Sequence, residues 1–319
     1  MNNWVVLLSS VAVSGNAFAV DAQPQIVNGI YANVTDFPSM VSLFTDTTGY
    51  EGYTTYGLFC GGSLINNQYV LTAAHCIYGS TAKQLLTSVV PQLQVETDFP
   101  HNILEKARVA EIYYPSTYND TSLFDDIAIL KLETPLTTVS SANYLNFPES
   151  NSYRDVSNSF IAVGHGNTAS NVDNSTSLLK TTLTYVPNED CNAYKSSTVN
   201  NLCMKGTPIS STTGLANATC QGDSGGPLFW SNGSIYIQVG ITSFGPTTCG
   251  DPSFDPTSIF TEVVKYRTWI DSVVAGTESP KIVVTESDRR AYLYPASDSG
   301  GSFGWWSLLL MFIPFIRRR

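Results

Sequence analysis

Short apolar or alternating runs follow one another between residue 26 and about residue 260. Clusters of Gly, Asn, Asp, Ser and Thr separate them, and typical runs are 69–71, 109–113 and 235–239. Short runs bounded by turn-forming residues predict many short strands, and so an all-β barrel or sandwich. The alternation by itself does not choose between a barrel and a sandwich.

The pattern changes near the end of this region. Residues 261–274 carry apolar side chains at helical spacing, which predicts a helix. We therefore expect the folded domain, 26–275, to end near Ala275. Residues 276–299 are polar and mixed, without a strong period, and predict a linker.

Both ends of the chain carry apolar segments of another kind. Residues 1–19 contain an apolar stretch and end in Ala17-Phe18-Ala19, which predicts a secretory signal peptide. The stretch lacks a leading Lys or Arg, so a buried N-terminal strand remains the alternative for residues 1–19. Residues 20–25, between this stretch and the folded domain, would form a short propeptide. Residues 300–319 combine Gly300-Gly301, an apolar run over 303–316 and three arginines. That run is short for a membrane-spanning helix.

Composition sets broad limits on the class of protein. The chain has 319 residues, of which 43% are hydrophobic and 13% charged, so it is long and apolar enough to bury one large or two ordinary domains. Its formal net charge of −10 argues against nucleic acid as a partner. No histidine pair has metal-binding spacing and no Gly-rich loop has phosphate-binding context, so we expect no metal and no cofactor.

A serine stands between glycines in the stretch 220–228. Gly222, Gly225 and Gly226 allow backbone conformations closed to other residues and keep side chains away from the Ser224 hydroxyl. Such a turn can direct neighbouring N–H groups at one point, as an oxyanion requires. The alternative is an ordinary Gly-rich hairpin turn.

A serine hydroxyl is a weak nucleophile unless a base takes its proton, and a carboxylate best holds that base. His75 ends an apolar strand and precedes a cysteine, and Asp126 begins another apolar strand. The segments 72–76, 126–130 and 222–227, in that order, resemble the signature segments of the trypsin/chymotrypsin-like serine proteases.

The resemblance implies an all-β fold of two six-stranded antiparallel barrels, with the active site in the cleft between them and a C-terminal helix. It implies that Ser224 attacks the scissile carbonyl, His75 is the general base and Asp126 orients it, with Asp125 a solvated neighbour. The amides of Gly222 and Ser224 would form the oxyanion hole, and the substrates would be proteins or peptides. The rival hypothesis is a catalytically inactive binding module, but all three residue types are present.

The six cysteines form an even set in a chain with an export signal, which predicts disulfides in any of 15 pairings. The resemblance selects three: Cys60–Cys76, Cys191–Cys203 and Cys220–Cys249.

A zymogen is also implied, because the sequence 26–29 resembles the N-terminus that these proteases acquire on activation. The freed ammonium of Ile26 would pair with Asp223. The preceding residue is Gln25, where the family usually has Arg or Lys, so a trypsin-like activator would not cut there. Another activating protease, or trimming from the leader side, must then expose Ile26.

Substrate recognition is expected at two places. Ser243, Phe244 and Gly245 resemble the edge segment that pairs with substrate backbone. Ala218 would form the base of the specificity pocket, with Thr219 beside it and Gly245 and Ser258 as walls. An uncharged base favours apolar or aromatic side chains before the scissile bond, because a cation there would be unpaired. In a shifted alignment Asp255 would reach the wall, and Lys or Arg would then be preferred.

Two histidines fall outside the signature segments. His101 follows a proline in a polar loop and is expected to be exposed. His165 is expected at the surface or in packing, with a place in the cleft as the alternative.

The C-terminal segment 300–319 resembles the GlyGly-CTERM sorting tail of secreted proteins from Gram-negative bacteria. That resemblance implies removal by a rhombosortase-type protease and export by type II secretion. A plain membrane anchor is the alternative. Either reading predicts a protease domain outside the cell, secreted or transiently anchored at the surface.

Overall fold

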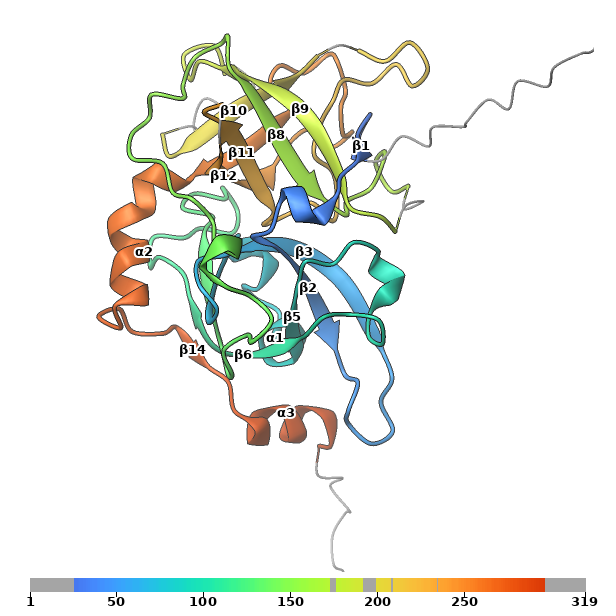
Figure 1. Ribbon diagram of the computed structural model, residues 1–319, viewed down its shortest axis with the longest axis vertical. Coiled ribbons are helices and arrows are strands. Elements are labelled where there is room, and N and C mark those ends of the chain that lie inside the picture. Colours follow the sequence, from blue (N-terminus) through green and yellow to red (C-terminus); the bar gives the residue numbers. More distant parts are fainter. Residues whose placement is uncertain (1–25, 173–175, 192–198, 208, 234, 296–319) are drawn as a thin grey trace, which may run out of the picture.

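The computed structural model describes residues 26–295, apart from 173–175, 192–198, 208 and 234. The predicted signal peptide, propeptide and sorting tail lie outside the described residues. Two β-barrels lie one above the other in Figure 1, and three short helices pack around them. No helix in the described ranges is long and apolar enough to cross a membrane.

The first barrel closes through antiparallel pairing in the order β6-β5-β2-β3-β4-β7, with β6 also paired to β7. Its buried apolar residues form the largest cluster of the protein, which includes Leu43, Val70 and Ile129. The strands of this barrel are β2 (Met40–Asp46), β3 (Tyr56–Leu64), β4 (Tyr69–Thr72), β5 (Thr87–Pro91), β6 (Ala107–Tyr113) and β7 (Ala128–Leu132).

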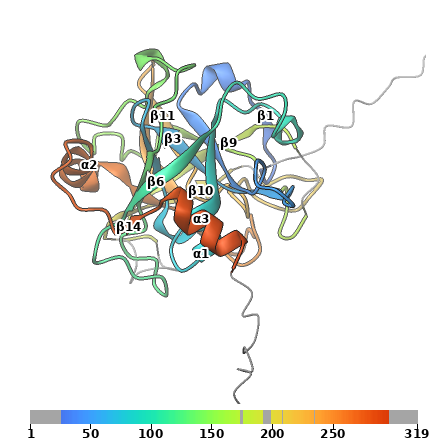
Figure 2. The same ribbon diagram turned by 90° about the horizontal axis from the view of Figure 1, so that it is seen from below.

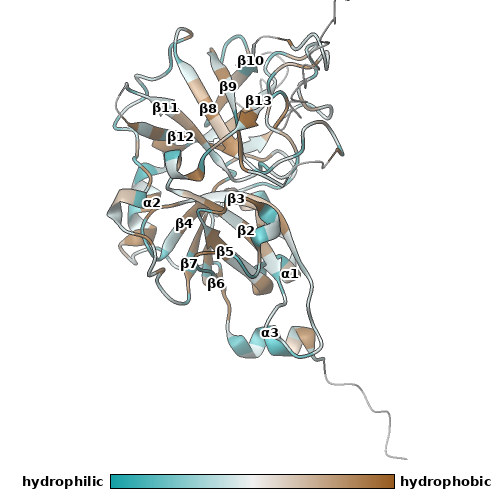
Figure 3. Cartoon of the chain, turned by 45° about the vertical axis from the view of Figure 1, so that its right-hand side comes forward, coloured by the Kyte–Doolittle hydropathy of each residue, from teal (hydrophilic) through white to brown (hydrophobic). Residues whose placement is uncertain are grey.

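The second barrel closes in the order β9-β10-β13-β12-β11-β8, with β8 also paired to β9. Its core gathers Phe160, Leu202, Leu228 and Phe260. Its strands are β8 (Ser159–Gly164), β9 (Leu179–Val186), β10 (Asn201–Gly206), β11 (Pro227–Ser231), β12 (Tyr236–Phe244) and β13 (Ser258–Glu262). The prediction of two six-stranded antiparallel barrels is confirmed. The pairings β6–β7 and β8–β9 close the two barrels, and Figure 3 shows hydrophobic residues concentrated on the strands.

Short segments complete the two barrels. The strand β1 (Ile30–Tyr31) adds to β9 beside the second barrel. The helix α1 (Thr81–Leu86) follows β4 and precedes β5 in the sequence of the first barrel. The single-turn 3₁₀ helices are η1 (Val34–Asp36), η2 (Ala74–Cys76), η3 (Glu96–Asp98), η4 (Ser141–Asn143) and η6 (Val263–Tyr266).

The C-terminal helix predicted over 261–274 forms only in the second half of that range, as α2 (Arg267–Val274). Residues 261–262 end the strand β13, and the 3₁₀ turn η6 separates it from the helix. The helix follows the last strand of the second barrel, yet its buried residues Ile270 and Val273 belong to the core of the first. The helix therefore carries the chain back across the junction and joins the two barrels.

The prediction of a linker over 276–299 is wrong for most of its length. The strand β14 (Ile282–Val283) pairs with β6, and the helix α3 (Glu286–Leu293) packs beneath the first barrel beside α1 (Figure 2). We call residues 281–294 the C-terminal strap. Its outward face is hydrophilic, which hid it from the sequence pattern, but Val284 and Leu293 are buried.

The deepest anchor of the strap is Arg289, whose side chain is completely buried. Its Nε donates to the carbonyl of Leu85 at 2.8 Å and its Nη2 to that of Val109 at 2.6 Å. Its Nη1 forms an ion pair with Glu133 at 2.5 Å. These three partners lie on three separate segments of the first barrel, so one side chain ties the strap to all of them.

Candidate active site

His75 sits at the end of the apolar strand β4, in the turn η2. The disulfide Cys60–Cys76 fixes this turn to β3. The backbone amide of His75 donates to Asp126 Oδ1 at 2.9 Å, and His75 Nδ1 lies 2.7 Å from Asp126 Oδ2. Because a carboxylate only accepts, Nδ1 carries the proton and Nε2 is left as the basic nitrogen.

Asp126 lies just before β7, is fully buried and forms hydrogen bonds with residues of both barrels. Ser243 of β12 donates its hydroxyl to Asp126 Oδ2 at 2.5 Å, and Thr261 of β13 donates to the Asp126 carbonyl at 2.8 Å. Ser243 was predicted only as a substrate-binding residue. No sequence signal links it to an aspartate 117 residues away.

Asp125 is not the solvated neighbour that we expected. It is 7% exposed, and its carboxylate accepts hydrogen bonds from the hydroxyls of Thr117 and Tyr266 and from the Asn200 side-chain amide. Its neighbours lie in segments distant in sequence, so the acidic pair 125–126 gave no sign that both members would be buried.

Ser224 lies in the predicted glycine-flanked turn between the barrels. The turn is held by bonds from the Gly61 amide to the Ser224 carbonyl at 2.8 Å and from the Gly225 amide to the Thr242 carbonyl at 2.9 Å. Gly225 has φ +74°, and a Cβ there would lie 2.2 Å from Thr72 Oγ1. The serine turn therefore packs directly against the residues that lead to His75.

Among the described residues, the side chain of His75 contacts Asp126 and Cys76 and forms no hydrogen bond with Ser224. The amides of Gly222 and Ser224 likewise donate to no acceptor in the part of the chain that the structure describes. Gly222 has φ +100°, and a Cβ there would lie 2.9 Å from the Gly166 Cα, so only glycine fits. The turn thus presents two N–H groups beside the serine.

A pocket of about 280 Å³ opens beside Ser224. Thr219, Ser243, Phe244 and Gly245 line it as predicted, together with residues of the Cys220–Cys249 connection. No charged side chain lines it: the full set is Thr219, Cys220, Gln221, Ser224, Thr242, Ser243, Phe244, Gly245, Pro246, Thr247 and Cys249.

The remaining predicted pocket residues stand behind this lining. Ser258 is buried. Its hydroxyl oxygen accepts hydrogen bonds from the Thr219 amide at 3.0 Å and from the Thr219 hydroxyl at 3.1 Å. Ala218 is buried against Val27 and the Cys220–Cys249 pair. Asp255, the residue of the shifted alignment, lies outside the lining and forms a half-exposed ion pair with Lys205.

Asp223 is buried and is not among the residues that line the pocket. Oδ1 accepts from the Gly166 amide at 2.8 Å and Oδ2 from the Cys220 amide at 2.9 Å. Burial raises the pKa of Asp223 to about 7, against the opposing effect of these two amides. None of the described Lys, Arg or His side chains forms an ion pair with it.

The segment 26–28 already lies against the same region. Ile26 and Val27 are fully buried, and Val27 forms a β-bridge with Ala218. Asn28 donates its side-chain amide to the Leu215 carbonyl at 2.7 Å. In the uncut chain the nitrogen of Ile26 is an uncharged amide, so it cannot supply a cation to Asp223.

Of the other histidines, His101 is exposed as expected. His165 is buried and therefore not at the surface, and burial lowers its pKa to about 4. It therefore stays neutral above that pH.

The cysteines form the three disulfides that the resemblance implied. His75 lies near Cys60 and Cys76, but those two sulfurs are bonded to each other and offer no thiolate to a metal.

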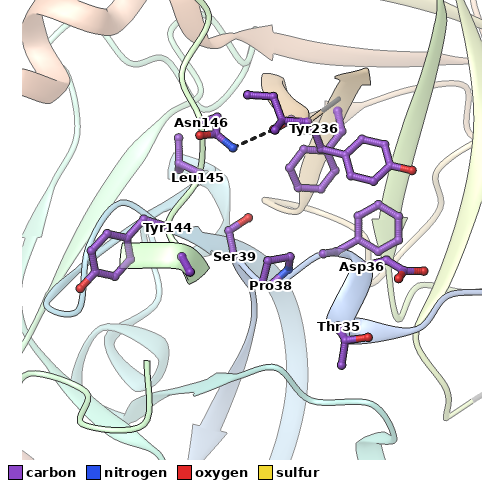
Figure 4. Close-up of a pocket in the computed structure, with 12 residues that line it drawn as sticks. Thr35, Asp36, Pro38, Ser39, Tyr144, Leu145, Asn146 and Tyr236 are labelled. Atoms are coloured by element: carbon purple, nitrogen blue, oxygen red, sulfur yellow. Dashed lines mark hydrogen bonds between the residues drawn. The ribbon is translucent and has the colours of Figure 1, made fainter. Parts of the chain in front are cut away.

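Larger cavities lie elsewhere among the described residues, including two of about 600 and 710 Å³. Figure 4 shows the first, where Asp36, Ser39, Tyr144 and Tyr236 surround the opening. Neither cavity includes His75, Asp126 or Ser224, so cavity size does not identify the reactive site.

The first barrel carries the His75–Asp126 pair, and the glycine-flanked turn of Ser224 on the second barrel packs against the segment that leads to His75, an arrangement typical of double-barrel serine hydrolases. The trypsin family model matches residues 26–270. The chain belongs to the trypsin family and is a serine endopeptidase.

Known relatives agree with this assignment. The chain is 30% identical to a CLIP domain-containing serine protease B4 of Anopheles gambiae over 79% of its own length and 71% of the relative. It is 29% identical to a venom serine protease of Polistes dominula, over 72% and 79%. The solved structure of human heparin binding protein shares the fold, with a TM-score of 0.64, 24% identity and coverage of 81% of this chain and all of that one.

Proposed function

We propose that this chain is an exported serine endopeptidase, made as a zymogen, in which Ser224, His75 and Asp126 act as the catalytic triad. The observation that carries the proposal is that Asp126 contacts both the backbone amide and Nδ1 of His75. The nearby serine turn has two backbone amides, of Gly222 and Ser224, that donate to no acceptor among the described residues. The reaction is acyl transfer, first to the enzyme and then to water.

Each group has a defined part in that reaction. His75 Nε2 accepts the proton of Ser224 Oγ as the oxygen attacks the scissile carbonyl, and later returns it to the leaving amine. Asp126 stabilises the imidazolium that forms in between. The amides of Gly222 and Ser224 bind the oxyanion, and loss of one such donor typically lowers kcat by about 10²–10³. A water then takes the place of the amine and releases the acyl group.

A fluorophosphonate, which reacts only with an activated serine, tests the triad. The processed enzyme should be labelled at Ser224, and Ser224→Ala should abolish labelling and lower kcat by about 10⁶. Asp126→Asn should slow both labelling and turnover, because it removes the carboxylate that holds His75. Labelling that persists in Ser224→Ala would refute the assignment of the nucleophile.

Activation is proposed to occur by cleavage between Gln25 and Ile26. The freed ammonium would pair with Asp223, a carboxyl that is buried without a cationic partner among the described side chains and whose pKa burial raises to about 7. Intact mass and N-terminal sequence of the exported protein test this step. A mature enzyme that begins at any other residue would contradict it.

The proposed specificity is for an uncharged, apolar or aromatic side chain before the scissile bond. The absence of charge from the lining described above supports it, as does the surface position of Asp255. Matched peptide substrates that differ only in Phe, Leu, Ala or Arg at that position give the test. A clear preference for Arg would reject this reading of the pocket.

Export and tail processing are proposed from the two ends of the sequence, 1–19 and 300–319. A rhombosortase-type protease would remove the tail and type II secretion would release the enzyme from a bacterial cell. The mass of the secreted form, with or without residues after 300, decides between removal and a retained anchor.

A further inference from the structure

Asp125 stands at the point where three segments meet behind the His–Asp pair. Tyr266 of η6 donates to Asp125 Oδ1 at 2.5 Å, and Asn200, which precedes β10 of the second barrel, donates to the same oxygen at 2.9 Å. Thr117, in the loop between β6 and β7 of the first barrel, donates to Oδ2. Both carboxylate oxygens are therefore occupied, and the donors come from both barrels.

The backbone at Asp125 is held in an unusual conformation. Its φ is +57°, in the left-handed region that non-glycine residues rarely adopt, and the Ile127 amide bonds back to the Asp125 carbonyl at 2.8 Å. A turn of this kind persists only where the surroundings hold it. The anchored carboxylate supplies that hold, and the next residue in the chain is Asp126.

The donors to Asp125 do not change with pH over the working range of an enzyme. Burial and the bond to Asp125 raise the pKa of Tyr266 far above its ordinary value, so its phenol stays a neutral donor. Asparagine and threonine do not titrate. The clamp is thus a fixed set of three hydrogen bonds.

We propose that Asp125 is a positioning residue, which fixes the tight turn that aims the Asp126 carboxylate at His75. This inference rests on the proposed role of Asp126. Asp126 makes two bonds to His75, to the backbone amide and to Nδ1, and both need the turn in one place. A displacement of about 1 Å in such a constellation can lower the rate by about 10²-fold.

The contact pattern selects the diagnostic variants. Asp125→Asn keeps an oxygen for Tyr266 and Asn200 and presents an amide to the Thr117 hydroxyl, which can also accept, so the clamp survives without its charge. Asp125→Ala removes the clamp. Tyr266→Phe removes one donor and keeps the ring in the core.

The assay is kcat and KM of the processed enzyme with a peptide substrate, with each rate divided by the concentration of sites titrated with fluorophosphonate. We expect Asp125→Ala to lower kcat by about 10- to 100-fold with KM changed less than about 3-fold, and Tyr266→Phe to lower kcat by about 3- to 10-fold. Asp125→Asn should stay within about 3-fold of the wild type.

Asp46→Ala is the matched control. Asp46 is another buried aspartate. Its carboxylate accepts hydrogen bonds from Lys106, Thr48 and Ser88 and forms an ion pair with Arg108, and none of these residues belongs to the His–Asp pair. Asp46→Ala should lower the yield of folded enzyme but leave kcat per titrated site unchanged, because a purely structural defect reduces the number of sites and not their rate.

The outcomes separate this inference from the proposed function. Wild-type kcat per site in both Asp125→Ala and Tyr266→Phe would overturn the positioning role, and so would an Asp125→Asn variant as slow as Asp125→Ala. If Asp125→Ala does not fold, Tyr266→Phe alone decides. An Asp126→Asn variant with full activity would instead overturn the triad itself.

Discussion

The C-terminal strap makes the sharpest prediction about stability. Arg289→Met replaces the buried guanidinium with an unbranched apolar side chain and removes two hydrogen bonds to backbone carbonyls and the ion pairs with Glu133 and Glu286. The carbonyls of Leu85 and Val109 lose their donor, and the half-exposed Glu133 loses its cation.

The magnitude follows from those partners. A buried acceptor left without a donor costs about 1–3 kcal/mol. The loss at two such carbonyls is offset in part, because the variant no longer buries a charged guanidinium. The free energy of unfolding should therefore fall by about 2–4 kcal/mol. In a domain of this size that corresponds to a fall in Tm of about 5–15 °C.

The adjacent residue provides the control. Arg290 lies on the same helix and pairs with Glu286 at 2.8 Å, but both side chains are more than half exposed. Arg290→Met should therefore change the free energy of unfolding by less than about 0.5 kcal/mol.

Urea unfolding of the wild type and both variants, followed by tryptophan fluorescence, measures the difference. Equal stability of Arg289→Met and Arg290→Met would show that the buried arginine does not hold the strap. A stop codon after Gly276 should destabilise the protein at least as much as Arg289→Met. A truncated chain with wild-type stability would mean that the strap adds nothing to the barrel.

Three further predictions concern activation. Because burial raises the pKa of Asp223 to about 7, the uncut native chain keeps a proton between about pH 4 and 7 that the unfolded chain releases. The free energy of unfolding should therefore fall as the pH rises through that window. Asp223→Asn should flatten this pH dependence when unfolding by urea is measured. Gly166→Ala should impair fluorophosphonate labelling after processing, since its Cβ would lie 2.3 Å from the Asp223 carboxyl carbon; labelling at the wild-type rate would contradict the tight fit. Gln25→Arg should allow trypsin to expose Ile26 and raise peptidase activity, whereas the wild type should not respond to trypsin.

Local sequence was sufficient to predict an all-β protein and the reactive residue types, whereas the two barrels followed from the family resemblance. The runs around Val70 and Ile129 became strands because short β-branched and aromatic stretches between turn residues suit a pleated, half-buried surface. The glycines at 222 and 225 take positive φ values, as expected for the tight turn that carries Ser224. The disulfide pairing followed from the family resemblance and not from spacing.

The errors share one physical cause. Asp125 looked solvated and 276–299 looked like a linker because both are polar in sequence, yet partners far along the chain bury them. Arg289 meets Val109 across 180 residues, and Asp125 meets Tyr266 across 141.

The sequence by itself determined which residues could do the chemistry and that the chain forms many short strands. Only the tertiary structure decided that Asp126 faces His75, that Ser243 and Thr261 of the other barrel hold it, and that the strap closes onto the first barrel. The reason is that hydrophobic period and turn chemistry are properties of neighbouring residues. A buried charge is satisfied instead by whichever donors the folded chain brings to it.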